Sequence, residues 1–288
     1  MRIKISFLLV LVCCFLSVQA QDLENSLLWK VSGNGLTSDS YLFGTLHATC
    51  NTSIKPRIIE AFNQTEQLAL EIDLSDPSLE LAMVKHMYIT DGKSMTDFLN
   101  EDETILLRDF LNEHIPTMNF AILRQIKPIF ISMILLQNAL PCETPKAYDD
   151  LLFEKAQAED KPIFGLESID DQMSVLDQIP VDEQVQELLK TAKDNMQSDQ
   201  DEFFELLDVY EAEQLENLGE LSLESESIFN NYVQELLDNR NVKWIAIIEK
   251  MMHEKPSFFG FGAMHLIGEK GVILLLRKLG YQVEAILP

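Results

Sequence analysis

The sequence contains none of the short motifs that mark several common enzyme classes. It has no His-Glu-x-x-His segment, no glycine-rich phosphate loop and no Gly-x-Ser-x-Gly turn. These absences argue against zincins, kinases and α/β-hydrolases. The chain also has no Cys-x-x-Cys pair, so neither a thioredoxin-like redox motif nor a cysteine-ligated zinc ribbon is supported.

Positive charge is scarce in this chain. Lysine and arginine number 22 against 47 aspartates and glutamates, which gives a net charge of −25. Nucleic acid is therefore a poor candidate for a partner. Many of the acidic residues lie between Asp201 and Ser227. A solvated helical face explains such a cluster, and an acidic groove for a basic substrate is the alternative.

The chain has no apolar run long enough to span a membrane, which takes about 20 residues. Its apolar run near the N-terminus, Phe7–Val18, follows the basic residues Arg2 and Lys4 and precedes the small residue Ala20. This pattern predicts a signal peptide over residues 1–20. We therefore expect a secreted or periplasmic protein.

The rest of the chain, residues 21–288, contains no Gly/Ser-rich or Pro-rich linker, and we expect it to form a single domain. Its longest apolar candidate, Pro128–Leu140, is interrupted by Gln137 and Asn138. A buried helix is the better interpretation, so no integral membrane segment is expected once the signal is removed.

Two cysteines, Cys50 and Cys142, remain after removal of the predicted signal. In an oxidising compartment such a pair predicts one disulfide. The alternative is two free, buried thiols.

A short pattern occurs twice in the sequence. An apolar run ends in Gly-x-x-His at Gly44–His47 and again at Gly262–His265. An amphipathic stretch and a second apolar run follow each copy, which is the pattern of a strand–helix–strand unit. Two such units in one sheet would bring both imidazoles to the same end of it, where they could bind a metal ion. We expect the glycines to allow tight backbone turns.

Helical periodicity dominates the segment between the two copies. Apolar residues recur at three- and four-residue spacing over 77–140, with a kink expected at Pro128. Further helices are predicted over 147–161 and 182–252, and short strands near both ends and at Ile163–Phe164. The predicted fold class is therefore α+β (mixed α/β), with a sheet assembled from distant parts of the chain and a large helical middle.

Several polar residues accompany the paired histidines. Glu71 and Asp73 alternate in the apolar strand predicted over 68–74, so we expect them on one face. Glu71 is the first candidate for an oxygen ligand beside His47 and His265, and Glu167 is the second. Mixed imidazole and carboxylate ligation suits Zn, Mn, Co or Fe(II).

An ion bound by these residues would activate water, and a second carboxylate could act as general base. A structural ion pair is the alternative explanation for the acidic residues. Arg240 and Asn241 lie in a predicted helix before an apolar run, which indicates a specific polar role. The alternative for this pair is a surface helix with a salt bridge.

The chain resembles the TraB/GumN family, to which the Tiki metalloproteases that act on Wnt are related. The resemblance extends from SLLWKVSG and YLFGTLH through LALEIDL, Tyr148-Asp149, KPIFGLESIDDQ and LLDNRNVKW to GAMHLIGEKGVILLLRKLGYQV. Ile267 stands where the family usually has proline.

The resemblance implies a site made of two histidines, a glutamate and an Arg-Asn pair. These map onto the residues His47, Glu71, Arg240, Asn241 and His265. It also implies divalent-metal-dependent proteolysis or a related hydrolysis.

The sequence thus predicts a secreted hydrolase, of the peptidase class, that depends on Mn, Co or Zn and acts on a peptide or protein. The predicted catalytic residues are Glu71, Glu167, Arg240 and Asn241. The main alternative is a non-catalytic secreted protein that sequesters a peptide or small ligand at the same site. A structural or interaction protein would leave the matched histidines unused.

Overall fold

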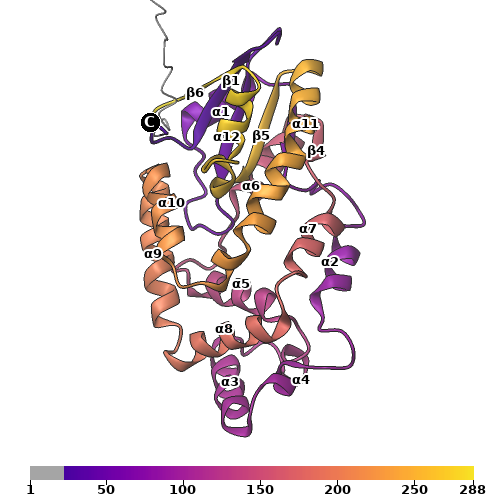
Figure 1. Ribbon diagram of the computed structural model, residues 1–288, viewed down its shortest axis with the longest axis vertical. Helices are drawn as coiled ribbons and strands as arrows, with labels where there is room; N and C mark the ends of the chain where they lie inside the picture. The colour runs from indigo at the N-terminus through magenta and orange to yellow at the C-terminus, as the bar shows by residue number, and fades with distance from the viewer. Residues whose placement is uncertain (1–22) are drawn as a thin grey trace, which may run out of the picture.

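The computed structural model describes residues 23–288. The predicted signal peptide lies outside these residues. In Figure 1 a β-sheet with its flanking helices forms the upper part of the molecule, and a group of helices forms the lower part. Both the helices and the six-stranded sheet are as expected for the predicted mixed α+β class.

The sheet is built from segments that lie far apart in the sequence. Its strands are β1 (Leu28–Gly33), β2 (Ser40–Thr45), β3 (Gln67–Leu70), β4 (Ile163–Gly165), β5 (Ser257–Gly262) and β6 (Tyr281–Ala285). Their order is β4-β3-β5-β2-β1-β6. The β1–β2 hairpin turns through Gly33, Asn34 and Gly35, which all have positive φ angles.

The central strand β5 lies between β2 and β3 and is parallel to both. Helix α1 (Pro56–Asn63) connects β2 to β3, and α12 (Val272–Lys278) connects β5 to β6. Both predicted strand–helix–strand units are therefore present. Since Thr45 is opposite Gly262, the two Gly-x-x-His segments leave neighbouring strands at the same end of the sheet.

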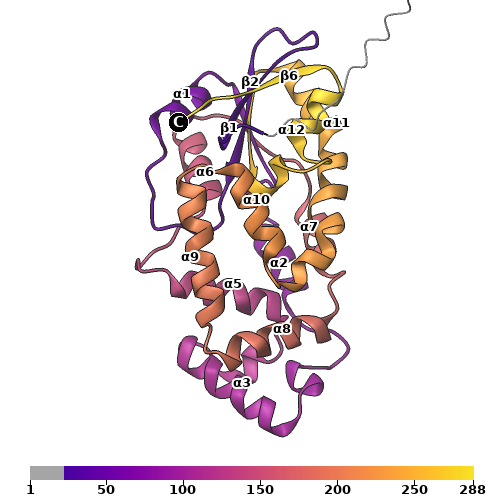
Figure 2. The same cartoon turned by 60° about the vertical axis from the view of Figure 1, so that its left-hand side comes forward.

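The remaining helices fill the middle of the chain. They are α2 (Leu79–Met87), α3 (Glu101–His114), α4 (Phe120–Leu123), α5 (Pro128–Ala139), α6 (Tyr148–Ala158), α7 (Ile169–Leu176), α8 (Val181–Lys193), α9 (Gln197–Glu211), α10 (Leu215–Glu224) and α11 (Asn239–Glu254). Figure 2 shows α1 and α6 on one side of the sheet and α11 and α12 on the other.

Pro128 does not kink one long helix as expected. The helix instead breaks into α4 and α5, and the amide of Lys127 donates to the carbonyl of Met87, 2.9 Å away. Proline disfavours helical backbone in the residue before it and lacks the amide that a helix interior requires. Here Pro128 begins α5, where the missing amide costs nothing.

The buried hydrophobic residues form two clusters. One surrounds the sheet and contains Trp29, Phe43 and Phe259. The other lies among α3, α5 and α8 and contains Leu107 and Leu188. The single domain over 21–288 remains a prediction. No helix between residues 23 and 288 combines the length and the apolar character that a membrane crossing requires.

The predicted disulfide between Cys50 and Cys142 is present, with the two Cα atoms 5.7 Å apart. Beside it the segments 46–50 and 142–149 are joined by backbone hydrogen bonds. The amide of Thr49 donates to Lys146 O at 2.9 Å, and the amide of Lys146 donates to Thr49 O at 3.0 Å. The loop that follows β2 is thus fixed to the start of α6.

Candidate active site

The two histidines of the repeated pattern follow β2 and β5. His47 lies two residues beyond β2, and His265 lies in a 3-10 turn, Ala263–Leu266, directly after β5. A Cβ atom placed on Gly262 would lie 3.3 Å from Glu71 Oε1, 3.6 Å from His47 Nε2 and 3.7 Å from His265 Cδ2. Three side chains from separate parts of the chain therefore surround one point, which we call the Gly262 point.

The two glycines of the pattern do not provide the tight backbone turns that we expected. Neither Gly44 nor Gly262 has a positive φ angle. At Gly44 a Cβ would lie 2.9 Å from the Cα of Ala263, so glycine allows close packing there. At Gly262 a Cβ would occupy the space among the three site residues. Packing thus requires glycine at position 44, whereas glycine at position 262 leaves the space among the site residues open.

Glu71 follows the last residue of β3 and is buried. Its Oε1 accepts from the Gly262 amide at 2.8 Å, and its Oε2 accepts from Gln172 Nε2 at 2.8 Å and Arg240 Nη2 at 2.5 Å. Burial would raise the pKa of Glu71, but interactions with His265, Arg240 and the Gly262 amide lower it to about 2. Glu71 is therefore an ionised carboxylate at neutral pH.

Asp73 does not share a face with Glu71 as expected. Strand β3 ends at Leu70, and Asp73 lies in a turn where its Oδ1 accepts from the amide of Ser75 at 2.8 Å. An aspartate that binds the amide two residues later favours a turn over an extended strand.

His265 is buried and its ring orientation is fixed by Asn241. Asn241 Nδ2 donates to two backbone carbonyls, those of His265 and Lys270, so its Oδ1 faces His265 Nδ1 at 2.6 Å. This contact places the proton on Nδ1 and the lone pair on Nε2, which lies 3.6 Å from Glu71 Oε1. Burial lowers the pKa of His265 to about 3, which keeps the ring neutral at neutral pH.

Arg240 connects the two glutamates of the site. Its Nε and Nη2 donate to Glu167 Oε1 at 2.9 and 2.6 Å, Nη2 also reaches Glu71, and Nη1 lies 3.2 Å from His265 Nε2. Nη1 also donates to Leu236 O, in a π-helical turn (Gln234–Asp238) just before α11. Such turns re-aim side chains and are frequent at functional sites.

The side chain of Glu167 is 8% exposed, and both of its carboxylate oxygens have partners. Oε1 accepts from Arg240, and Oε2 accepts from Trp244 Nε1 at 3.3 Å. Burial raises the pKa of Glu167 despite the opposing effect of Arg240. The indole ring of Trp244 also lies against His265, with ring centroids 4.5 Å apart, so it supports both residues.

His47 is the exposed member of the site, with 71% of its side chain accessible. Its Nδ1 lies 3.4 Å from Asp149 Oδ2, whereas its Nε2 faces the Gly262 point. The nearby carboxylates of Asp149 and Glu71 raise the pKa of His47 to about 9.

The side chains around the Gly262 point are of the types that bind divalent metal ions. No group of three or more His, Cys, Asp or Glu side chains within residues 23–288 is already arranged as a metal cluster. However, His47 Nε2, Glu71 Oε1 and the Cδ2 edge of the His265 ring face a space that glycine leaves open, and an oxygen acceptor lies opposite each Nδ1. His265 Nε2 lies 3.6 Å from the same Glu71 oxygen. Mixed nitrogen and oxygen donors with this outer support are typical of Zn, Mn and Co sites.

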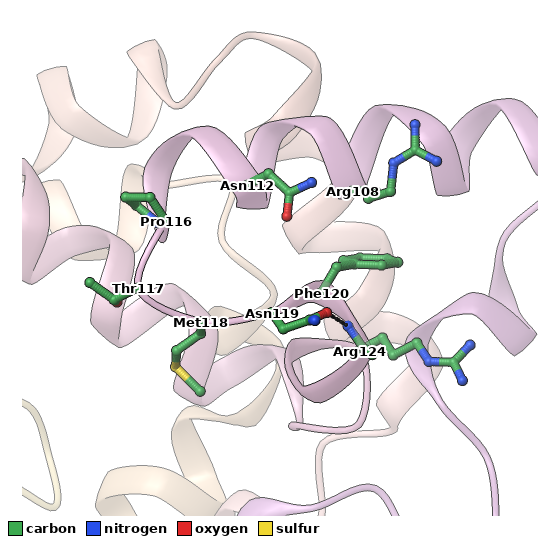
Figure 3. A pocket seen from close by; sticks show the side chains of 9 residues that line it. Arg108, Asn112, Pro116, Thr117, Met118, Asn119, Phe120 and Arg124 are labelled. Atoms are coloured by element: carbon green, nitrogen blue, oxygen red, sulfur yellow. Dashed lines mark hydrogen bonds between the residues drawn. The ribbon is translucent and has the colours of Figure 1, made fainter.

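A separate hollow in the helical part of the molecule contains no predicted site residue. It has a volume of about 670 Å³ and lies between α3 and α4. Figure 3 shows the side chain of Phe120 between those of Arg108 and Arg124. Both arginines are exposed, and nothing there resembles the polar cluster at the Gly262 point.

Five of the predicted residues are thus in direct contact, namely Glu71, Glu167, Arg240, Asn241 and His265. His47 joins them at the Gly262 point. Their assignment as site residues remains a prediction.

Sequence reasoning did not assign roles to three further residues of the cluster: Gln172, Asp149 and Trp244. All three lie inside segments that carry the family resemblance, which is the one signal that could have drawn attention to them.

The chain is similar to two proteins that are named as metalloproteases. Metalloprotease TIKI1 of Danio rerio is 21% identical over 327 residues, which cover 94% of this chain and 65% of that protein. Metalloprotease TIKI1 of Homo sapiens is 23% identical over 329 residues, covering 94% and 64%. The chain thus spans a little less than two thirds of the length of these relatives.

No solved structure matches the chain. The TraB/PrgY/gumN family, by contrast, matches residues 27–285, nearly all of the residues that the structure describes. The chain therefore belongs to the TraB/PrgY/gumN family.

Proposed function

We propose that this protein is an exported, divalent-metal-dependent hydrolase that cleaves peptide bonds. The observation that carries the proposal is the convergence of His47, Glu71 and His265 on the Gly262 point. Two relatives named as metalloproteases support the reaction class. The Cys50–Cys142 disulfide supports export, because disulfides persist in oxidising compartments.

In this proposal, Nε2 of His47, Nε2 of His265 and Oε1 of Glu71 hold the ion. When bound, an ion such as Zn, Mn or Co activates water and polarises the carbonyl of a peptide bond. Gly262 keeps the space between the three side chains free, since any larger residue would place a Cβ within 3.7 Å of all of them.

The surrounding residues keep His265 and Glu71 in the forms that bind an ion, whereas His47, with its pKa raised to about 9, would release a proton on binding. Asn241 holds the proton of His265 on Nδ1, so the lone pair is on Nε2, where an ion would take the place of the contact with Arg240 Nη1 at 3.2 Å. Arg240 and the Gly262 amide keep Glu71 ionised and aim its two oxygens. Glu167 binds Arg240 through one oxygen and Trp244 through the other, so we assign it the task of orienting Arg240.

The test combines turnover with metal dependence. The mature chain is incubated with a peptide library, with and without added Mn, Co or Zn, and after treatment with EDTA. Cleavage only in the presence of an ion, abolished by EDTA, is the expected result. Ion or peptide binding without any cleavage would replace this proposal with a sequestering protein.

Variants of the histidines locate the reaction. His47→Ala and His265→Ala should each reduce cleavage by roughly a hundredfold or more, and the double variant should lose little beyond that, because residues that act as one unit are not additive. His253→Ala is the matched control, since this histidine is exposed on α11. An equal loss in His253→Ala would refute the assignment.

A further inference from the structure

Asp149 has an unusual environment for an aspartate outside the proposed ligand set. It lies in the first turn of α6, and its Oδ1 accepts from Thr45 Oγ1 at 3.1 Å. Its Oδ2 is buried and has no hydrogen-bond partner within strict geometry. His47 Nδ1 lies 3.4 Å from this oxygen. A buried carboxylate oxygen without a partner costs free energy, so it calls for an explanation.

The backbone holds Asp149 and His47 opposite each other. The amide of Tyr148 donates to Leu46 O at 3.0 Å, so the residue before Asp149 is bonded to the residue before His47. The paired amides of Thr49 and Lys146 and the Cys50–Cys142 disulfide extend this connection. Several main-chain contacts therefore hold Asp149 and His47 opposite each other, so their arrangement does not depend only on the orientation of the exposed ring.

We infer that Asp149 is a positioning residue that accepts a hydrogen bond from His47 Nδ1 and so turns His47 Nε2 toward the Gly262 point. This inference rests on the proposed function, since it assigns Asp149 a role in holding the ion. Asn241, in α11, does the same for His265, which follows β5. The two histidines thus have matching supports, one a carboxylate and one an amide.

The difference between the two supports has a physical reason. His265 is buried beside the Arg240 guanidinium, where a second anion is not needed and a neutral amide suffices. His47 is exposed, and its ring would rotate freely without a strong acceptor. A charged acceptor makes the stronger hydrogen bond and also increases the donor strength of Nε2.

The experiment uses the mature chain and compares Asp149→Asn with Asp150→Asn. Asp150 is the adjacent residue and is exposed, so its variant controls for loss of one charge. In the metal-free protein, the ¹⁵N NMR signal of His47 Nδ1 should move in Asp149→Asn and stay in place in Asp150→Asn. Titration with Mn or Zn should show affinity lower by roughly tenfold to a hundredfold in Asp149→Asn.

The two readouts separate the possible failures. Unchanged ring signals and unchanged affinity in Asp149→Asn would overturn the inference. If the wild-type chain binds no ion while the ring signal still depends on Asp149, the proposed function fails and the positioning contact itself stands. If Asp149→Asn does not fold, Thr45→Val removes the hydrogen bond to Oδ1 and should move the same His47 signal. A Thr45→Val chain with wild-type signals would then count against the inference.

Discussion

Replacement of Arg240 by methionine tests the charge arrangement of the site. Arg240 is 7% exposed and neutralises Glu71 and Glu167, whose side chains are 7% and 8% exposed. Methionine preserves much of the volume but leaves two buried carboxylates facing each other. Removal of one partner from a buried ionic group costs about 3–5 kcal/mol, and we expect a loss in this range at pH 7.

The loss should shrink as the pH falls. Without Arg240, burial and mutual repulsion raise the pKa of each carboxyl above its ordinary value of 4.5. A carboxyl with a raised pKa in the folded state destabilises the fold at high pH and ceases to do so once it is protonated. Arg240→Met should therefore lose less stability at pH 5 than at pH 7.

Urea denaturation at the two pH values measures this effect. Arg108→Met is the control, because Arg108 pairs with Asp109 on the surface, where both side chains are exposed. Its loss should stay within about 0.5 kcal/mol. Addition of Glu167→Gln to Arg240→Met should recover part of the lost stability. An Arg240→Met chain as stable as the control at pH 7 would refute the buried charge arrangement.

Three other changes give distinct outcomes. Gly262→Ala should fold normally, since its φ of −47° suits alanine, but it should lose ion binding in a metal titration. Gly44→Ala should lose about 1–3 kcal/mol of stability in urea denaturation, because its Cβ would overlap Leu266 and Ala263. Reduction of the disulfide should destabilise the chain by about 4–5 kcal/mol on the chain-entropy estimate for its sequence separation of 92, and thermal melts with and without reductant measure this. Burial would raise the pKa of Glu213, but hydrogen bonds from neighbouring cations lower it, so its stabilising contribution is present above pH 4.5 and is lost as the pH falls below that value. Glu213→Gln should cost about 1.5–3 kcal/mol at pH 7. The stability of this variant should decline less than that of the wild type on acidification.

The repeated Gly-x-x-His pattern was sufficient to predict how the sheet brings the histidines together. Each copy follows an apolar strand, and parallel strands release their following loops at one sheet end. The pairing of β2 with β5 required no further information. Glu71 was predictable for the same reason, since it follows β3, the other neighbour of β5.

Other parts of the cluster depend on contacts that the sequence does not encode locally. Asp149 is one of 47 acidic residues in the chain, and Gln172 stands in no distinctive local pattern. Each has its role because of the side chain that the fold places opposite it. The kink predicted at Pro128 is instead a break between two helices, because the amide of Lys127 donates to the carbonyl of Met87 in another helix. Likewise, local hydrogen bonding at Asp73 ended β3 earlier than the apolar pattern indicated.

The position of β5 in the sheet has a consequence for how the protein is made. Strands β2 and β3 have no contact across the sheet until residues 257–262 insert between them. A ribosome or an export channel must therefore deliver almost the entire chain before the sheet can close. Until then both strands present open edges, which are prone to association with other chains. A product that stops before Ser257 would lack His265 and the common neighbour of β2 and β3, and it would be a substrate for quality-control proteases.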